Sequence, residues 1–273
     1  MRTQFQRIQF QKLARPIKKT LTAVAITVVT STAMMNVAHA DAIGLYLGGQ
    51  VWDSNATGLF GERDQQIDFN LANKQQGSFF IALEHPLPFL PNLKISSTTL
   101  DTKGATTLST DFNFAGTTFP PSSANTVFNT RYIDYTAYYE VFDNDLLTFD
   151  FGLTARKIDV KIAVDATTAT TPPVSSNATL RASSYVPMFY AAFIFGIPTT
   201  DFNVFANGNF LSFKGQTLYD YQAGISYELV DNLAVDVNLT LGYRDVKLEL
   251  DNIDNLYTNL EFSGAFAGAI VHF

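Results

Sequence analysis

The last fifteen residues, Asn259-Leu-Glu-Phe-Ser-Gly-Ala-Phe-Ala-Gly-Ala-Ile-Val-His-Phe273, alternate without interruption and contain no proline. Counted back from Phe273, every second residue belongs to an apolar stripe: Val271, Ala269, Ala267 and Ala265. A period of two predicts a β-strand with one apolar face. The chain therefore ends in a predicted strand closed by an aromatic residue, and the rest of the sequence shows which kind of sheet that strand joins.

The first forty residues differ in charge from everything that follows. They carry six basic residues and no acidic ones, whereas the other 233 residues carry 12 basic and 25 acidic side chains, a net charge of -13. A moderately apolar run follows Lys18-Lys19, and Ala38-His39-Ala40 supplies the small residues that signal peptidase requires. We predict a signal peptide over residues 1–40, cleaved between Ala40 and Asp41. A transmembrane anchor is the alternative, but the run is short and rich in Thr, and a spanning helix needs about 20 apolar residues.

The composition of the chain excludes several classes of protein. There is no cysteine, so neither a disulfide scaffold nor a lipid anchor on a cysteine at the cleavage site is available. The acidic balance argues against a nucleic-acid partner, for which a basic face is expected.

The mature chain, residues 41–273, repeats the alternating pattern ten times. The ten expected strands lie at residues 41–52, 77–84, 93–101, 131–142, 147–156, 181–196, 202–213, 218–229, 233–249 and 259–273. Long polar loops are expected at 53–75, 102–130 and 164–180, and tight turns at 86–92, 143–145, 197–200 and 231–232. Pro187 predicts a local bend or bulge in its strand.

These features together predict an all-β fold: a single transmembrane antiparallel up-and-down β-barrel in the bacterial outer membrane. Ten strands are expected, with eight and twelve as the alternatives, since such barrels use even strand numbers, strands of about 9–11 residues and short periplasmic turns. A soluble β-sandwich also alternates. The export signal, the terminal Phe273 and the nearly continuous apolar face favour the barrel. Closure is required because lipid offers no partner to an open sheet edge.

One sequence motif occurs twice, 88 residues apart, as Tyr139-Glu-Val-Phe-Asp-Asn144 and Tyr227-Glu-Leu-Val-Asp-Asn232. Duplication and independent convergence on Asp-Asn turns both explain it. On the polar face of these hairpins, Asp134 should lie opposite or diagonal to Arg156, and Asp220 should have the same relation to Arg244. A charge inside a narrow barrel is stabilised only when paired or hydrated. We predict a lumen polar network that narrows or plugs the barrel, made of Asp134, Glu140, Asp150, Arg156, Asp220, Glu228, Asp236 and Arg244.

Several motifs lie near the two ends of the mature chain. They are Asp41-Ala-Ile-Gly-Leu-Tyr-Leu-Gly-Gly-Gln-Val-Trp52, Leu241-Gly-Tyr-Arg244, Asp251-Asn-Ile-Asp-Asn-Leu-Tyr257, and Leu260-Glu-Phe-Ser-Gly264 with its continuation to Phe273. With them, the two hairpins and Gly152-Leu-Thr-Ala-Arg156, the sequence resembles a family of small uncharacterised outer-membrane β-barrel proteins of Gram-negative bacteria. The resemblance implies a location and a fold, and it supplies no catalytic residues.

For function, the sequence predicts no enzyme and no catalytic, cofactor-binding or metal site. The mature chain has two histidines, His85 and His272, and both are expected at the periplasmic end, away from the outer rim where barrel enzymes act. An omptin-like or lipid-modifying enzyme is therefore the least favoured alternative. The acidic loop residues match no calcium loop in spacing.

The favoured interpretation is a narrow or occluded barrel with a structural or surface-interaction role. The alternative is a porin-like channel for small solutes or hydrophobic ligands. Ten strands leave a thin lumen. The alternation of side chains along the strands predicts four inward-facing aromatic residues, which favours occlusion: Tyr138, Phe205, Phe262 and Phe266. The expected partners are outer-membrane lipid and lipopolysaccharide, the outer-membrane assembly machinery and periplasmic chaperones, with no nucleic acid, and the protein is expected to be a monomer.

Deletion of Phe273 is expected to impair insertion of the barrel into the outer membrane, because the terminal aromatic residue is the predicted recognition signal for the assembly machinery. The folded fraction in isolated outer membranes, measured by heat-modifiable gel mobility, would fall. Normal assembly of the shortened chain would contradict this role.

Overall fold

The structure, a computed structural model, describes residues 43–62, 65–87, 89–144, 146–213, 216–232, 234–253 and 255–273. The predicted signal peptide and its cleavage point at Ala40 and Asp41 lie outside these residues. The strands are β1 (Gly44–Glu62), β2 (Gln65–Asp68), β3 (Lys74–Glu84), β4 (Asn92–Leu108), β5 (Phe112–Phe114), β6 (Thr117–Phe119), β7 (Ser122–Asp143), β8 (Leu147–Thr167), β9 (Ser175–Gly196), β10 (Phe202–Phe213), β11 (Gln216–Asp231), β12 (Asp236–Ile253) and β13 (Leu256–His272). No helix in the described part of the chain is long and apolar enough to cross a membrane.

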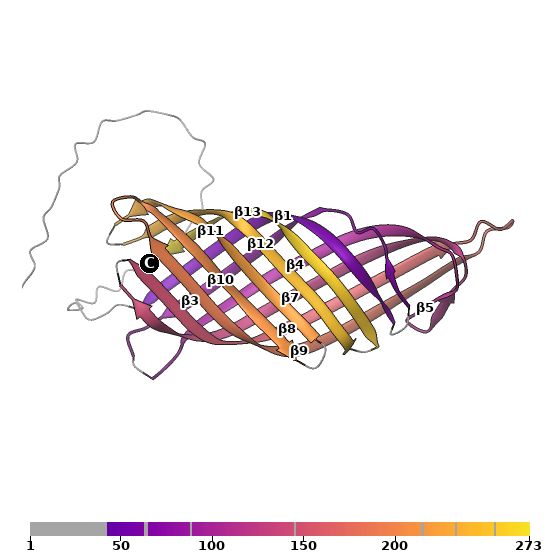
Figure 1. The fold of residues 1–273 in the computed structure, drawn as a ribbon, viewed down its shortest axis with the longest axis horizontal. Coiled ribbons are helices and arrows are strands. Elements are labelled where there is room, and N and C mark those ends of the chain that lie inside the picture. The colour runs from indigo at the N-terminus through magenta and orange to yellow at the C-terminus, as the bar shows by residue number, and fades with distance from the viewer. Residues whose placement is uncertain are drawn as a thin grey trace, which may run out of the picture. The chain divides into compact units, whose positions relative to one another are not determined.

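Ten of these strands form one closed antiparallel barrel (Figure 1). Their order around the barrel is β13-β12-β11-β10-β9-β8-β7-β4-β3-β1, and β13 closes the ring by pairing with β1. The last residue takes part in the closure, since the Phe273 amide donates to the Leu45 carbonyl at 3.0 Å and the Leu45 amide donates to the Phe273 carbonyl at 3.2 Å. The short β2 adds only to the edge of β1, and β5 pairs with β6 alone.

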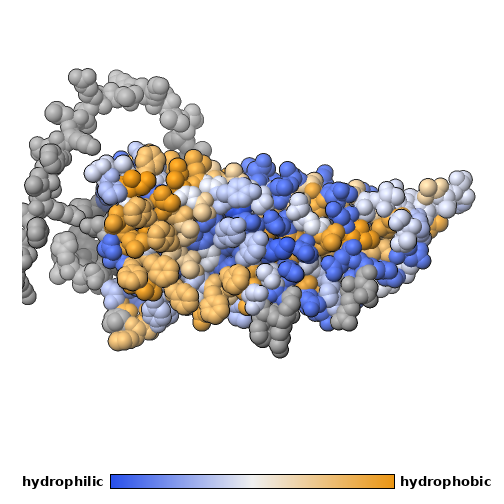
Figure 2. All heavy atoms as spheres, viewed as in Figure 1, coloured by the Kyte–Doolittle hydropathy of each residue, from blue (hydrophilic) through white to orange (hydrophobic). Residues whose placement is uncertain are grey.

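A belt of exposed apolar side chains surrounds the half of the barrel nearest the C-terminus (Figure 2). The belt includes Leu47, Ile81, Ile95, Tyr135, Phe151, Leu153, Phe189, Val204, Ile225 and Leu241, all of them exposed. A continuous apolar surface of this kind is rare on a protein that faces water. A closed barrel leaves no backbone group without a partner in lipid, so this belt is the membrane-spanning part of the protein.

The barrel continues well beyond the belt. β7 and β9 have 22 residues each and β8 has 21, about twice the number needed to cross a bilayer. Outside the belt the outward positions of these strands are polar, including Asn125, Arg131, Lys161, Asp165 and Arg181, and hydrophilic residues dominate that half of the surface in Figure 2. We call this part the extension.

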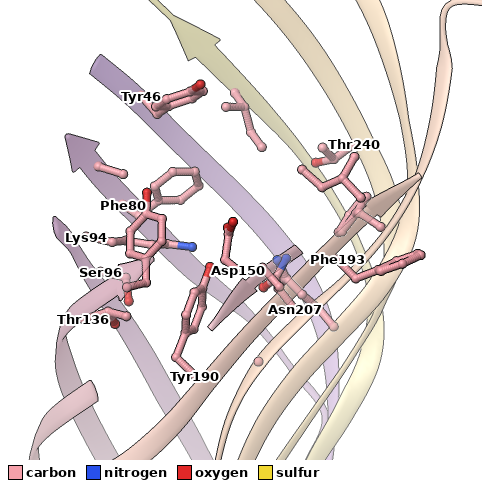
Figure 3. Close-up of a pocket in the computed structure, with 18 of the residues that line it drawn as sticks. Tyr46, Phe80, Lys94, Ser96, Thr136, Asp150, Tyr190, Phe193, Asn207 and Thr240 are labelled. Carbon is pink, nitrogen blue, oxygen red and sulfur yellow. The ribbon is translucent and has the colours of Figure 1, made fainter. Parts of the chain in front are cut away.

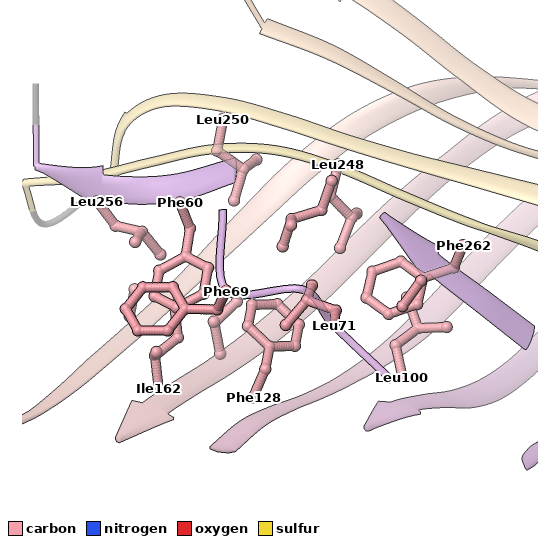
Figure 4. Close-up of a cluster of buried hydrophobic side chains, with 14 of the residues drawn as sticks. Phe60, Phe69, Leu71, Leu100, Phe128, Ile162, Leu248, Leu250, Leu256 and Phe262 are labelled. Atoms are coloured by element: carbon pink, nitrogen blue, oxygen red, sulfur yellow. The ribbon is translucent and has the colours of Figure 1, made fainter. Parts of the chain in front are cut away.

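Most inward positions of the extension are apolar and form a core (Figure 4), although Thr102, Thr126 and Thr130 are also buried there. The core side chains are buried and come from β1, β4, β7, β8, β12 and β13 and from the segment between β2 and β3: Phe60, Phe69, Leu71, Leu100, Phe128, Ile162, Leu248, Leu250, Leu256 and Phe262. Phe60 stacks on Phe69 with their ring centroids 4.8 Å apart. The alternation therefore reverses along the same strands: apolar side chains face outward in lipid and inward where the outside is water.

The extension corrects the predicted loops. Residues 53–75 contain the C-terminal part of β1 and all of β2. Residues 102–130 contain the end of β4, the β5–β6 hairpin and the start of β7. Residues 164–180 contain the end of β8 and the start of β9. Their Thr, Ser and Asn content predicts loops. In the structure most of these polar side chains face water from one side of a strand, whose other side carries the core.

Two segments close over the core. The β5–β6 hairpin buries Phe112, Phe114 and Phe119, and the chain between β2 and β3 runs along β4, where the Ala72 amide donates to the Lys103 carbonyl at 2.8 Å. Gly104 permits this approach, because a Cβ there would lie 2.3 Å from the Phe69 carbonyl oxygen.

Of the bend or bulge predicted at Pro187, the bulge is absent. β8 and β9 pair in unbroken register through Ala155 and Pro187. β10 pairs with β9 only from Phe189 to Gly196, so Pro187 lies where β9 has a single neighbouring strand. A residue without an amide donor is tolerated at such an edge.

The two copies of the repeated motif, residues 139–144 and 227–232, form the same kind of hairpin. The register shifts between Glu140 and Phe142 in the β7–β8 pair and between Glu228 and Val230 in the β11–β12 pair, at equivalent positions. Each turn is held by its Asn: Asn144 Oδ1 accepts from two following amides, and Asn232 Oδ1 does the same. The sequence repeat is thus a structural repeat, including its bulge.

Substitution of Phe128 by Ala is expected to lower the free energy of unfolding by about 3–5 kcal/mol, because it leaves a cavity beside Phe60 and Phe262. Val127, its exposed neighbour on β7, gives the control: Val127→Ala should change stability by less than about 0.5 kcal/mol. Urea unfolding in micelles can be followed by fluorescence of the single tryptophan, Trp52. Equal effects of the two substitutions would contradict the assignment of a packed core.

Candidate functional site

A layer of charged side chains crosses the lumen where the belt meets the extension. Arg156 on β8 donates from Nε and Nη2 to the two carboxylate oxygens of Asp134, at 2.7 Å each. The same Nη2 donates to Asp220 Oδ2 at 2.9 Å, although Asp220 lies on β11, three strands away around the barrel. Arg244 on β12 donates from Nε and Nη2 to the two oxygens of Asp220, at 2.9 Å each. The two guanidinium groups and the two carboxylates thus balance in charge, and we call them the charged layer.

Neutral groups add hydrogen bonds to the charged layer, in which Arg156 Nη1 is buried without a partner among the described residues. The Tyr132 hydroxyl donates to Asp220 Oδ2 at 2.6 Å and accepts from Arg244 Nη2 at 3.2 Å, while the Tyr132 ring lies 3.9 Å from the Arg156 guanidinium carbon. Asn209 donates to Asp134 Oδ2 at 3.3 Å. Arg156 is 0% exposed, and Asp134 and Asp220 are buried. Because water does not solvate these charges, they depend on one another for stabilisation.

The structure brings four of the eight predicted network residues together, namely Asp134, Arg156, Asp220 and Arg244. The relations expected along the strands are present: Asp134 pairs directly with Arg156, and Asp220 is diagonal to Arg244. Both arginines point into the lumen. The bond between Arg156 and Asp220 joins strands that are not neighbours, and no strand-pair argument could have found it.

The other four residues lie elsewhere. Asp150 and Glu140 face a cavity on the short-turn side of the charged layer. Glu228 and Asp236 do not join the network, and their inclusion was wrong: eight residues separate Glu228 from Asp220, about 26 Å along a strand. Asp236 lies opposite His272, whose Nδ1 is 3.1 Å from Asp236 Oδ2.

Glu228, Asp231 and Asp236 place carboxylate oxygens within 4.8 Å of one another at this rim. Two of the three side chains are partly buried and one is exposed, and clusters of exposed acids are common without an ion. The cluster therefore carries no metal assignment.

The cavity has a volume of about 430 Å³ and is lined by both polar and aromatic side chains (Figure 3). Lys94, Phe80 and Tyr190 were not among the predicted site residues. Lys94 extends inward from β4 and places its ammonium 4.4 Å from the Phe80 ring centroid and 5.5 Å from that of Tyr190. The alternation of side chains along β9 could have identified Tyr190 as an inward-facing residue. The position of Lys94 between two aromatic rings could not be predicted in this way, because it depends on how three strands pack together.

No protein-family model matches the sequence, and no curated protein is significantly similar to it. Among solved structures the chain is similar to the outer membrane protease OmpT from Escherichia coli, at 11% identity over 86% of this chain and 99% of that one, with a TM-score of 0.49. It is also similar to Neisserial surface protein A (13%, 85% and 100%, TM-score 0.32) and to the transport unit of the autotransporter AIDA-I from Escherichia coli (9%, 88% and 92%, TM-score 0.38).

The location follows from the molecule itself. The barrel is closed, antiparallel and even in strand number, it carries an apolar belt, and both ends of the described barrel lie at the rim with the short turns. These are the properties of a barrel that spans a bacterial outer membrane, with its short turns toward the periplasm. The chain is a ten-stranded outer-membrane β-barrel.

Replacing Arg156 by Gln is expected to lower the free energy of unfolding by about 3–5 kcal/mol, because Asp134 and Asp220 then lose a buried cationic partner. Arg181→Gln, on the exposed face of the neighbouring strand β9, is the matched control and should cost less than about 0.5 kcal/mol. Urea titration of the two variants in micelles measures both values. If Arg156→Gln were as stable as the control, the charged layer would not be what holds these carboxylates in the lumen.

Proposed function

We propose that this protein is a closed, non-conducting outer-membrane barrel whose role is structural or lies in surface interactions made by the extension. The observation that carries the proposal is the filling of the lumen by two successive layers of different chemistry. The charged layer comes first from the periplasmic side, and the apolar core of the extension follows it.

The charged layer supports closure because its hydrogen bonds reach across the lumen. Arg156 on β8 donates to Asp134 on β7 and to Asp220 on β11, and Arg244 on β12 donates to Thr98 on β4 at 3.2 Å. In the ten-stranded ring, β8 lies three strands from β11 and β12 lies four strands from β4. An ion would have to separate buried ion pairs in order to pass.

The core of the extension supports closure independently. Phe128 packs against Phe60 and Phe262, with ring centroids 6.3 Å and 6.0 Å apart, and these three side chains come from β7, β1 and β13. An interior in which apolar side chains predominate offers few hydrogen-bond partners to water. Loss of the charged layer alone would therefore leave the lumen closed.

The outer surface of the extension supports a role in contacts with other molecules. It carries both signs of charge together with many Thr, Ser and Asn side chains on long, paired strands. Such a surface is held rigidly outside the membrane and presents hydrogen-bonding groups in fixed positions. Within the proposal the protein acts as a monomer among outer-membrane lipid and lipopolysaccharide, after delivery by periplasmic chaperones and the assembly machinery.

The proposal includes no catalysis. His85 hydrogen-bonds within the β3–β4 turn, to the Pro91 carbonyl at 3.2 Å, and His272 pairs with Asp236 at the same rim. Both imidazoles of the described barrel are thus far from the extension, where an omptin-like or lipid-modifying enzyme would need a general base.

Planar-bilayer recording tests the proposal. The purified protein should give no steady ion current, and Arg244→Ala should also give none, because the apolar core remains intact. A known trimeric porin inserted under the same conditions controls for insertion. Steady, voltage-independent conductance from the unmodified protein would favour the channel and overturn the closed barrel.

A further inference from the structure

The cavity on the periplasmic side of the charged layer is a separate feature of the barrel and has no part in sealing it. It lies between that layer and the short turns, and its lining includes Glu84, Lys94, Glu140, Asp150 and Tyr190. Glu140 and Asp143 reach its outer edge and are exposed there. The cavity therefore opens toward the periplasm and ends at the buried ion pairs.

Asp150 is the residue in this cavity that its surroundings leave unsatisfied. It is 8% exposed, it points into the cavity (Figure 3), and its Oδ1 has no hydrogen-bond partner in the described structure. The residues paired with Asp150 on the two adjacent strands are Glu140 and Ala192. Neither side chain is a cationic hydrogen-bond donor. A carboxylate without a partner at this degree of burial is costly, so it marks a place where a positive donor would be stabilised.

The remaining charged groups of the cavity are already engaged. The Tyr138 hydroxyl donates to Glu84 Oε1 at 2.7 Å, and Asn92 Nδ2 donates to Glu140 Oε1 at 3.1 Å. Lys94 makes no ion pair within the described residues, and its ammonium rests against the faces of Phe80 and Tyr190. Outside the charged layer the lining thus holds four carboxylates, Glu84, Glu140, Asp143 and Asp150, against one ammonium.

The walls of the cavity already accommodate an ammonium group. The rings around Lys94 attract a cation by their electron-rich faces, and Tyr138 and Tyr190 pack with ring centroids 5.6 Å apart as a further aromatic wall. A shared metal ion fits less well, because Glu84, Glu140 and Asp150 do not form a set of three whose carboxylate oxygens all lie within 4.8 Å of one another.

We propose that this cavity binds a small primary ammonium compound with an aromatic or other apolar body. The ammonium group donates to Asp150, and the apolar body packs against Tyr138 and Tyr190. The ligand enters from the periplasm and goes no further than the charged layer. The proposal does not depend on whether the extension seals the barrel, because binding at this depth needs neither conduction nor its absence.

Isothermal titration calorimetry in a neutral maltoside detergent tests the proposal with 2-phenylethylamine as the probe. The matched probes are 2-phenylethanol, which lacks the charge, and 3-phenylpropionate, which carries the opposite one. The amine should bind saturably, and the alcohol and the acid should not. Asp150→Asn should weaken amine binding about 10- to 100-fold, the range expected for a lost charge-assisted hydrogen bond.

Two further variants distinguish the proposed contact from a general charge effect. Asp159→Asn removes a carboxylate from the same strand on its exposed outer face and should bind the amine as the unmodified protein does. Lys94→Met removes the resident ammonium and should bind the amine at least as tightly. Retained heat-modifiable mobility shows that each variant is folded.

Four outcomes would overturn the proposal. They are no saturable amine binding at millimolar concentration, equal binding of the alcohol, unchanged amine binding by Asp150→Asn, and binding of the acid that Lys94→Met abolishes. The last would identify the cavity as a site for anions. None of them bears on conductance, which tests the closed barrel separately.

Discussion

The bond from Arg156 to both Asp134 and Asp220 is the interaction on which the lumen depends. Each of these groups is buried, so none is stabilised by bulk water, and each would be costly alone. Together with Arg244 they form two cations and two anions held by hydrogen bonds of 2.7–2.9 Å. Because Asp220 accepts from both arginines, β8 and β12, four strands apart in the ring, are fixed relative to one another. The layer separates the periplasmic cavity, which is lined by polar and aromatic side chains, from the apolar core of the extension.

That division matches a change of solvent outside the barrel. In the belt, lipid covers the outward side chains, and the polar groups face inward. In the extension, water covers the outward side chains, and the apolar groups face inward to form the core around Phe60 and Phe128. The same strands suit both environments because their apolar residues face outward in the belt and inward in the extension. The hydrophobic effect thus acts on the extension as in a soluble protein, while the belt is retained by lipid.

The repeated hairpins show how one scaffold acquires different chemistry. In the first, Glu140 lies opposite Asp150, and in the second Glu228 lies opposite Asn238. Asn238, and not Asp236, is therefore the structural equivalent of Asp150. The first hairpin places a buried carboxylate in the periplasmic cavity, and the second places a neutral amide at the corresponding position. The cavity is asymmetric for this reason, although the backbone of the two hairpins, with their bulges and Asn-held turns, is alike.

The sequence by itself determined the closed antiparallel barrel, its ten strands and the inward position of Asp134, Arg156, Asp220 and Arg244, because a period of two fixes the face of every residue within a strand. It did not reveal the extension, because Thr, Ser and Asn are common both in loops and on the water-facing side of strands. Only the tertiary structure decided that Arg156 reaches Asp220, that Lys94 lies between Phe80 and Tyr190, and that Asp150 lacks a partner. Such contacts depend on the curvature of the closed sheet, which brings side chains from non-neighbouring strands together across the lumen, and no local pattern in the chain records that distance.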